Sequence, residues 1–216
     1  VPEDAVVDHG FVSWTDEQGK DIHAKHDDRS STGAYVFDEE SAAIFDKEMG
    51  LEDDFDWNNI YTRQQFQESR FKSDAVSPDG ATSIAQIMPN AFKDGLKKGY
   101  VPEGTKYEDL ATDDALAIQF QKSYMEDLMS RSWNKGTEEV KIAKALAAYN
   151  MGPTGLVNYL TEQKAAGVDI YNSLDWIEGL NKETKNYVSN ILTGGDVEYE
   201  AEFEKEHTRY LGEQES

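Results

Sequence analysis

The sequence predicts an all-α or mainly α fold on three observations. Apolar and aromatic side chains recur every four positions from Leu116 to Leu128, which is the spacing of one face of an α-helix. Thr137 precedes two glutamates, an arrangement typical of a helix N-cap with an acidic first turn. The sequence contains neither an internal repeat nor a block rich in strand-forming residues, so we expect helices to form the core.

The N-terminal residues give a mixed signal. Residues 1–35 combine Gly, Ser, Asp and His with scattered aromatic residues, and Trp14 argues against full disorder. Phe11, Val12 and Trp14 are interpreted either as a short strand or as a segment lying on the core. Residues 38–49, which precede Gly50, predict a short helix.

The central residues predict a series of helices joined by turns. Ser77-Pro78-Asp79-Gly80 has proline at the second position and predicts a turn. Gly95, Gly99, Pro102 and Gly104 predict a loop over 94–111. We expect helices over 57–69, over 83–88 with Pro89 at or just before the end, from Thr112 or Asp113 to 128, and over 138–149, 154–166 and 182–192.

The C-terminal residues alternate glutamate with other side chains after Gly194-Gly195. This alternation is interpreted as an edge strand or as an acidic arm. The predicted organisation is therefore an acidic N-terminal extension over 1–56, a central domain over 57–193 and an acidic C-terminal tail over 194–216.

Charge is concentrated at the two ends of the chain. The net charge is −22; residues 1–56 hold 17 acidic and 4 basic side chains, and residues 194–216 hold 8 acidic and 2 basic ones. The central part holds 18 acidic and 15 basic side chains. Nucleic acid is not an expected partner, because binding phosphates needs clustered Lys and Arg. The acidic ends favour solubility, a saline habitat or docking on a basic partner.

Composition excludes several further classes. The chain has no cysteine, which excludes disulfides, cysteine catalysis and thiolate metal sites. No segment has the 18 or so apolar residues that a membrane span needs. The first residues lack a basic region followed by an apolar run, so we expect no signal peptide, although a processed N-terminus would look the same.

The four histidines stand at positions 9, 23, 26 and 207, all outside 57–193. A Ser-His-Asp site in the central domain is thereby excluded, and carboxylate, tyrosine and lysine remain for acid–base chemistry. His23 and His26 lie near Asp27 and Asp28, yet no third, separated group of ligands is evident. We therefore expect neither a metal site nor a cofactor.

The stretch Gln67–Pro89 carries the strongest functional signal. Glu68 is placed at the expected end of a helix, and apolar residues such as Phe66, Phe71 and Val76 surround it in the sequence. An apolar pocket raises the pKa of a carboxyl group towards the range of a general acid. Asp74 and Asp79 lie in polar turn contexts and are interpreted as turn formers.

Four motifs accompany Glu68 in order along the chain. They are E-S-R-F at 68–71, A-V-S-P-D-G-A-T-S-I-A-Q-I-M-P at 75–89, A-L-A-A-Y-N-M-G-P at 145–153 and E-T-K-N-Y-V at 183–188. Over about residues 57–192 the chain resembles the soluble lytic transglycosylase (SLT) domain, a lysozyme-like family of glycosidases that act on peptidoglycan. The family's Gly-Leu-Met reads Ser83-Ile84-Ala85 here, its Ala after Tyr-Asn reads Met151, and a helix motif is reduced to Ala117-Ile118 and Tyr124-Met125, changes that bear on groove shape.

The resemblance implies a role for each matching residue. Glu68 matches the catalytic acid, and Tyr149 matches the tyrosine that hydrogen-bonds this carboxyl group. Ser69 is expected to orient the helix end, and Ser77 to touch the substrate's N-acetyl group. The remaining matches are expected to line the substrate groove: Gln86, Met88, Asn150, Glu183 and Tyr187.

The resemblance also implies a mechanism with one carboxyl group. Glu68 would protonate the glycosidic oxygen after N-acetylmuramic acid, the sugar's N-acetyl oxygen would stabilise the cationic centre, and Glu68 would then deprotonate the C6 hydroxyl to form a 1,6-anhydro ring. Two alternatives stay open: a hydrolase that uses Glu68 with water, and a non-catalytic structural part of the cell wall or of a virion. The expected partner is the peptidoglycan glycan strand. The expected lack of a signal peptide, together with the acidic ends, suggests delivery by a phage particle or a secretion apparatus.

Overall fold

The computed structural model describes residues 6–8, 11–15, 21–26, 35–37 and 56–214. The chain divides into two units, Val1–Asp54 and Phe55–Ser216, and each is described by itself. The predicted helix over 38–49 lies outside the described residues.

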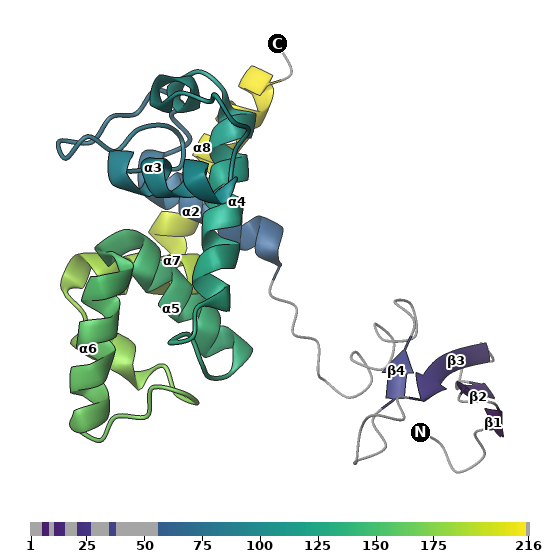
Figure 1. Cartoon of the computed structure of the whole chain (residues 1–216). Coiled ribbons are helices and arrows are strands. Elements are labelled where there is room, and N and C mark those ends of the chain that lie inside the picture. The colour runs from purple at the N-terminus through teal and green to yellow at the C-terminus, as the bar shows by residue number, and fades with distance from the viewer. Residues whose placement is uncertain (1–5, 9–10, 16–20, 27–34, 38–55, 215–216) are drawn as a thin grey trace. The chain divides into compact units, whose positions relative to one another are not determined.

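The N-terminal unit contains a four-stranded antiparallel sheet in the order β1-β2-β3-β4 (Figure 1). Its strands are β1 (Val6–Asp8), β2 (Phe11–Thr15), β3 (Asp21–His26) and β4 (Tyr35–Phe37). The expectation that no strand-rich block exists is therefore wrong, whereas the strand interpretation of Phe11, Val12 and Trp14 is confirmed. These strands are three to six residues long, too short to give a clear pattern beside the polar residues around them.

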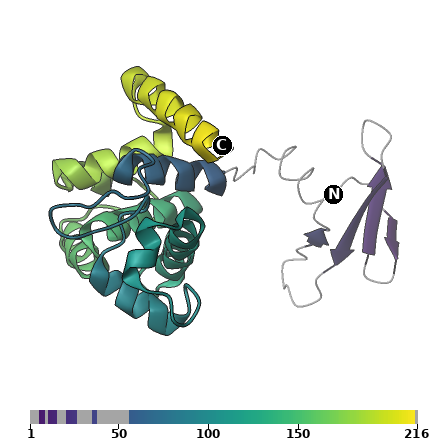
Figure 2. The same cartoon turned by 90° about the horizontal axis from the view of Figure 1, so that it is seen from above.

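The second unit is helical, which confirms the predicted mainly α class for the central part of the chain (Figures 1 and 2). Its α-helices are α2 (Trp57–Ser69), α3 (Pro89–Lys98), α4 (Asp114–Ser130), α5 (Glu138–Met151), α6 (Pro153–Ala165), α7 (Lys182–Thr193) and α8 (Val197–Gln214). Two 3₁₀ helices, η1 (Tyr107–Ala111) and η2 (Asp175–Gly179), complete it. No helix of the described part is both long enough and apolar enough to cross a membrane.

Local caps fix where the long helices begin. The Asp113 carboxylate accepts from the Leu116 amide at 3.1 Å, and the Thr137 hydroxyl accepts from the Val140 amide at 3.4 Å. Each bond satisfies an amide that the first helical turn leaves free. Of the two alternatives for the start of α4, Asp113 is thus the cap.

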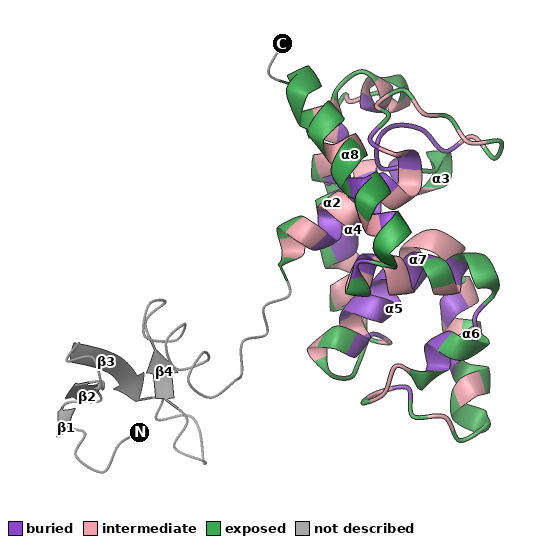
Figure 3. Cartoon of the chain, turned by 180° about the vertical axis from the view of Figure 1, so that it is seen from behind, coloured by how far each residue is buried: buried purple, intermediate pink, exposed green. Residues whose placement is uncertain are grey.

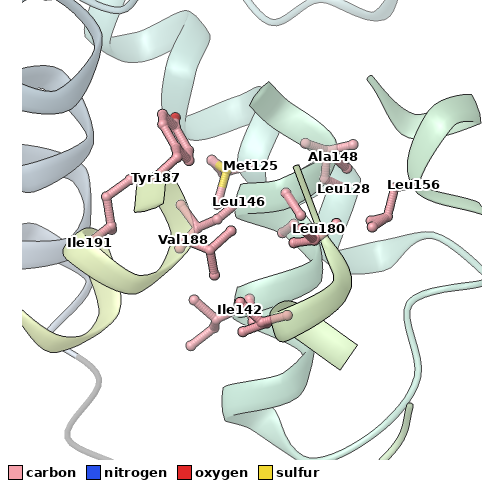
Figure 4. Packing of buried hydrophobic residues seen from close by; sticks show 14 of the residues in the cluster. Met125, Leu128, Ile142, Leu146, Ala148, Leu156, Leu180, Tyr187, Val188 and Ile191 are labelled. Atoms are coloured by element: carbon pink, nitrogen blue, oxygen red, sulfur yellow. The ribbon is translucent and has the colours of Figure 1, made fainter. Parts of the chain in front are cut away.

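Helix α5 is the central element. From Ile142 to Ala148 every side chain is fully buried, and four alanines there let other helices approach closely (Figure 3). Ile142 and Leu146 belong to one apolar cluster with Met125 and Leu128 of α4 and with residues of α6 and α7 (Figure 4). This packing fixes α4, α5 and α7 relative to one another.

A second apolar cluster joins α2 to α3, α4 and α8. The ring of Phe66 packs edge-on against Tyr199 and Phe203 at centroid distances of 5.1 and 5.5 Å. Phe71 stacks on His207 and Tyr210 at 5.3 and 5.4 Å. The end of α2 is therefore held by residues about 130 positions away.

The C-terminal residues form a helix rather than an edge strand or a separate acidic arm. Tyr199, Phe203, His207 and Tyr210 are spaced by three or four positions, so they lie on one face of α8 and meet Phe66 of α2 and Phe71 directly after it. Among the glutamates between them, Glu202 and Glu204 are exposed. Alternating glutamates therefore fit a period of two in the sequence although the segment is a helix. The predicted boundary at residue 193 does not separate two compact units, because Phe55–Ser216 forms one.

Candidate active site

Glu68 stands in the last turn of α2, directly before a sharp change of chain direction. Arg70 and Phe71 have left-handed backbones, with φ of 56° and 58°. The Ser69 hydroxyl donates to the Ile84 carbonyl at 2.8 Å and so ties the end of the helix to the turn that follows. The Arg70 guanidinium lies 4.1 Å above the ring of Phe66 and donates to the Phe66 carbonyl at 2.9 Å.

The segment 75–88 is a closed turn, not the predicted helix over 83–88. Ser83 and Gln86 have φ of 78° and 46°, which no α-helix contains. The Gln86 amide donates to the carbonyls of Ala75 and Ser83, both at 2.9 Å, and thereby closes the turn. Pro89 is the first residue of α3, a position that suits proline because the first amide of a helix needs no partner.

Within the described residues, four non-glycine residues have a positive φ. Two of them, Arg70 and Phe71, directly follow the end of α2 that carries Glu68, and the other two, Ser83 and Gln86, lie in the 75–88 turn. Left-handed backbone is costly for side chains with a Cβ and persists only where the surroundings enforce it. Here the Ser69, Arg70 and Gln86 hydrogen bonds enforce it. The same hydrogen bonds hold the end of α2 and the 75–88 turn on two sides of one hollow.

This hollow is a cleft of about 770 Å³. Seven residues that the sequence singled out line it: Glu68, Ser77, Gln86, Met88, Tyr149, Asn150 and Glu183. Tyr187 and Ser69 do not line it; both are buried behind its wall. Asp79 and Tyr124 also line it, although the sequence assigned Asp79 to a turn and Tyr124 to the apolar face of a helix. The Tyr124-Met125 remnant of the helix motif was the signal for Tyr124.

The hydrogen bond to Glu68 comes from a different tyrosine than expected. The Tyr187 hydroxyl donates to Oε1 of Glu68 at 2.6 Å, whereas the Tyr149 hydroxyl donates to the Ala85 carbonyl at 2.8 Å. The expectation that Tyr149 bonds this carboxyl group is therefore wrong. Tyr187 reaches Glu68 because α7 packs directly against α2, while Tyr149, at the end of α5, meets the turn.

The remaining predicted residues are fixed in place by local bonds. The Ser77 hydroxyl accepts from the Ala81 amide at 3.0 Å. The Thr184 hydroxyl donates to Oδ1 of Asn150 at 2.7 Å and so joins the end of α5 to the start of α7. Glu183 is exposed in the first turn of α7, where a carboxylate is favoured by the helix dipole.

Burial raises the pKa of Glu68 from 4.5 to about 8. The Tyr187 hydrogen bond pulls this pKa down and the charge of Glu183 pushes it up, but desolvation is the largest effect. Glu68 is only partly exposed, at the wall of the cleft, so that its carboxyl group is mostly neutral at pH 7. Burial also raises the pKa values of Tyr149 and Tyr187 well above 10.0, so both hydroxyls stay protonated.

Oε2 of Glu68 has no hydrogen-bond partner within 56–214, whereas Oε1 is taken by Tyr187. The cleft lining contains neither Lys, Arg nor His. The arrangement thus presents one neutral carboxyl group with a free oxygen, which can give a proton to a molecule in the cleft and take one back.

Two buried glutamines behind Glu68 were missed by the sequence analysis. Gln64 of α2 and Gln121 of α4 are fully buried; Gln121 donates to Gln64, and Gln64 donates to Tyr187. Their positions within apolar helix faces gave no functional signal.

Groups of three or more metal-ligating side chains do not occur among the residues described. Asp27 and Asp28 lie outside those residues, as do the side chains of His23 and His26.

Comparison with known proteins adds three findings. The family model of the transglycosylase SLT domain matches residues 59–172. The membrane-bound lytic murein transglycosylase F of Actinobacillus succinogenes is 31% identical over 160 residues, which are 74% of this chain and 30% of that protein. The chain thus spans less than a third of this relative.

Two solved structures are similar in fold. The 70 kDa soluble lytic transglycosylase SLT70 of Escherichia coli superposes with a TM-score of 0.52 at 23% identity, over 75% of this chain and 24% of that one. An inactive mutant of the lytic transglycosylase Slt of Pseudomonas aeruginosa superposes with a TM-score of 0.50 at 27% identity, over 77% of this chain and 24% of that one.

Proposed function

Because this chain belongs to the transglycosylase SLT domain family, we propose that it cleaves the β-1,4 bond between N-acetylmuramic acid and N-acetylglucosamine in peptidoglycan. The single observation that carries the proposal is the neutral carboxyl group of Glu68, at the wall of a cleft with one oxygen held and the other free. General acid catalysis needs a group that is protonated at working pH and within reach of the leaving oxygen.

The proposed reaction uses Glu68 twice. Its proton passes to the glycosidic oxygen while the bond from that oxygen to C1 of the muramic acid breaks, and the substrate's own N-acetyl oxygen stabilises the cationic C1. The Glu68 carboxylate then takes the proton of the C6 hydroxyl, and O6 bonds to C1. The products are a 1,6-anhydro end and a free 4-hydroxyl, with no water consumed.

The cleft offers substrate contacts on both sides of Glu68. In this proposal Ser77 meets the N-acetyl group and Met88, which is 42% exposed, forms an apolar wall. Oε1 of Gln86 stays available because the amide nitrogen is engaged with the turn. Tyr149, Asn150 and Glu183 complete the groove.

Product analysis by mass spectrometry on purified cell wall tests the proposal. We expect anhydro ends, and we expect Glu68→Gln to lower the cleavage rate at least about a hundredfold, because an amide cannot donate the proton. Glu103→Gln, which neutralises an exposed loop glutamate, is the matched control and should cleave at the wild-type rate. Cleavage should also fall as the pH rises through about 8, where Glu68 loses its proton.

Three other outcomes point elsewhere. Reducing ends in place of anhydro ends would identify a hydrolase that uses Glu68 with water. Glycan binding with no turnover at any pH would identify a structural component. Wild-type cleavage by Glu68→Gln would remove Glu68 from the mechanism.

We place this reaction at the bacterial cell wall. Delivery by a phage particle or a secretion apparatus stays a prediction that comes from the acidic ends of the chain. A pull-down with the full chain at low and high salt tests it, since docking through these ends should weaken as salt screens the charge.

A further inference from the structure

Gln64 and Gln121 carry amide groups into the interior behind Glu68. Both side chains are fully buried, where α2 and α4 face each other. A buried amide is costly unless its donors and acceptors are paired. These two amides bond each other, and that of Gln64 also bonds Tyr187.

The hydrogen bonds in this group run in one direction. Nε2 of Gln121 donates to Oε1 of Gln64 at 2.8 Å, and Nε2 of Gln64 donates to the hydroxyl oxygen of Tyr187 at 3.0 Å. The Tyr187 hydroxyl then donates to Oε1 of Glu68 at 2.6 Å. We call Gln121, Gln64 and Tyr187 the amide relay.

The direction of the relay is anchored at its far end. Nε2 of Gln121 also faces the backbone carbonyl of Tyr61 at 3.4 Å, and its Oε1 accepts from Gln65 at 2.9 Å. A carbonyl only accepts, so turning the Gln121 amide over would set two acceptors against each other. Turning Gln64 over would likewise set its nitrogen against that of Gln121.

The direction of the relay bears on which oxygen of Glu68 holds the acid proton. Because Gln64 donates to the Tyr187 oxygen, the tyrosine's own hydrogen points to Oε1 of Glu68. A proton on Oε1 would lie close to this hydrogen and be repelled by it, so the proton of the neutral carboxyl group stays on Oε2. Without Gln64 the phenol is free to turn and to accept the proton of Glu68 itself.

We propose that Gln64 is a positioning residue, which acts through Tyr187 to keep the acid proton of Glu68 on the oxygen that has no protein partner. The inference rests on the proposed role of Glu68 as general acid. Gln64 does not line the cleft, and its side chain bonds Tyr187 and not the carboxyl group of Glu68, so we expect its effect on the reaction to pass through the tyrosine.

The test replaces Gln64 by methionine, which keeps the length of the side chain, lies well beside Met125 and removes the donor. The charged and titratable groups that face Glu68 are Tyr187 and Glu183 of α7 and Tyr149 of α5, and the substitution changes none of them. Should Gln64→Met not fold, Gln64→Leu serves as the second variant.

Two readouts are measured. Titration of the Glu68 carboxyl by infrared difference spectroscopy, wild type minus Glu68→Gln, needs no turnover. We expect its midpoint in Gln64→Met to rise by roughly one pH unit, since the neutral acid gains a bond to the tyrosine and the carboxylate loses a polarised donor. At pH 6, where both forms keep the proton, we expect kcat on soluble glycan fragments to fall roughly tenfold with KM little changed.

Two further variants separate positioning from packing. In the Tyr187→Phe background, adding Gln64→Met should move the midpoint no further, because the relay is already cut. Asn134→Leu removes a buried amide that bonds the Leu128 and Lys141 carbonyls outside the relay. It should lower stability and leave the titration of Glu68 unchanged.

An unchanged midpoint in Gln64→Met, or an equal rise in the Tyr187→Phe background, overturns the proposal. A wild type without any cleavage activity would refute the proposed function instead, and the infrared titration would still decide about the relay.

Discussion

Replacing Glu68 by glutamine should make the protein more stable than the wild type by an amount that grows as the pH rises. In the unfolded chain this carboxyl group loses its proton near pH 4.5, whereas in the fold it does so near pH 8. Between these values the folded state holds a proton that the unfolded state has released, so unfolding becomes easier with each pH unit. The stability that this group contributes is complete below pH 4.5 and is lost as the pH rises to about 8.

The size of the effect follows from the two pKa values. From pH 5 to pH 7 the wild type loses about 2.5 kcal/mol through Glu68, because one pKa unit is worth about 1.4 kcal/mol. Glu68→Gln has no proton to lose and keeps the acceptor for Tyr187. The melting temperature of Glu68→Gln minus that of the wild type should therefore grow by roughly 5 to 10 °C over this interval.

Thermal unfolding followed by far-UV circular dichroism at pH 5 and pH 7 measures the difference. Both values lie above the isoelectric point of about 4.4, where an acidic chain stays soluble. Glu103→Gln, an exposed loop variant, is the control and should show no such growth. If the difference in melting temperature between Glu68→Gln and wild type were the same at pH 5 and pH 7, the raised pKa of Glu68 would be refuted. Its carboxyl group would then not be neutral at pH 7.

Three further substitutions test the fold around the site. Phe203→Ala should lower the free energy of unfolding in urea by about 3 to 5 kcal/mol, because the ring is only 5% exposed in the cluster under α2. Gly95→Ala would place a Cβ 2.4 Å from an aromatic carbon on α4 and should cost about 1 to 3 kcal/mol, whereas Gly155→Ala, with 3.6 Å to its nearest neighbour, should cost nothing. Tyr149→Phe should lower the free energy of unfolding by about 1 kcal/mol, because this hydroxyl bonds the Ala85 carbonyl. It should also slow cleavage without shifting the pH at which the cleavage rate falls on the alkaline side, because the hydroxyl does not bond Glu68.

Opposite results would be informative in each case. A stable Phe203→Ala would mean that α8 does not support α2. An equal cost for both glycine variants would show that α3 moves freely against α4. If the alkaline fall of the cleavage rate shifted in pH in Tyr149→Phe, the Tyr149 hydroxyl would be in direct contact with Glu68.

Periodic spacing and caps predicted the long helices well. Asp113 and Thr137 mark the starts of α4 and α5. In the four-residue stripe of α4, Phe120 and Leu128 are buried as expected, whereas Leu116 and Tyr124 are partly exposed. The motif residues also converge, since seven of the nine singled out line one cleft. These features depend on local interactions, which a sequence displays directly.

The errors arose where distant parts of the chain decide the structure. The 83–88 segment forms a turn because Gln86 bonds two carbonyls across it, and nothing in its apolar letters reveals this. The alternating C-terminal glutamates led to the prediction of an edge strand or an acidic arm. The segment is a helix because its aromatic residues pack against the end of α2, which lies far away in the sequence. The exchange of Tyr149 for Tyr187 as partner of Glu68, and the roles of Gln64, depend on how α2, α4 and α7 pack.

The contact between α8 and the end of α2 joins parts of the chain that are far apart in the sequence. Arg70 and Glu202 form an ion pair across 132 positions, so that a long stretch of chain must close before α8 can dock. Closing so long a stretch of chain costs more conformational entropy than pairing neighbouring helices, and therefore takes longer. We thus expect α8 to dock after the folding transition state. Weakening α8 should then accelerate unfolding and leave the folding rate nearly unchanged. The time for which the end of α2 holds Glu68 in place thus depends on how long α8 stays docked against it.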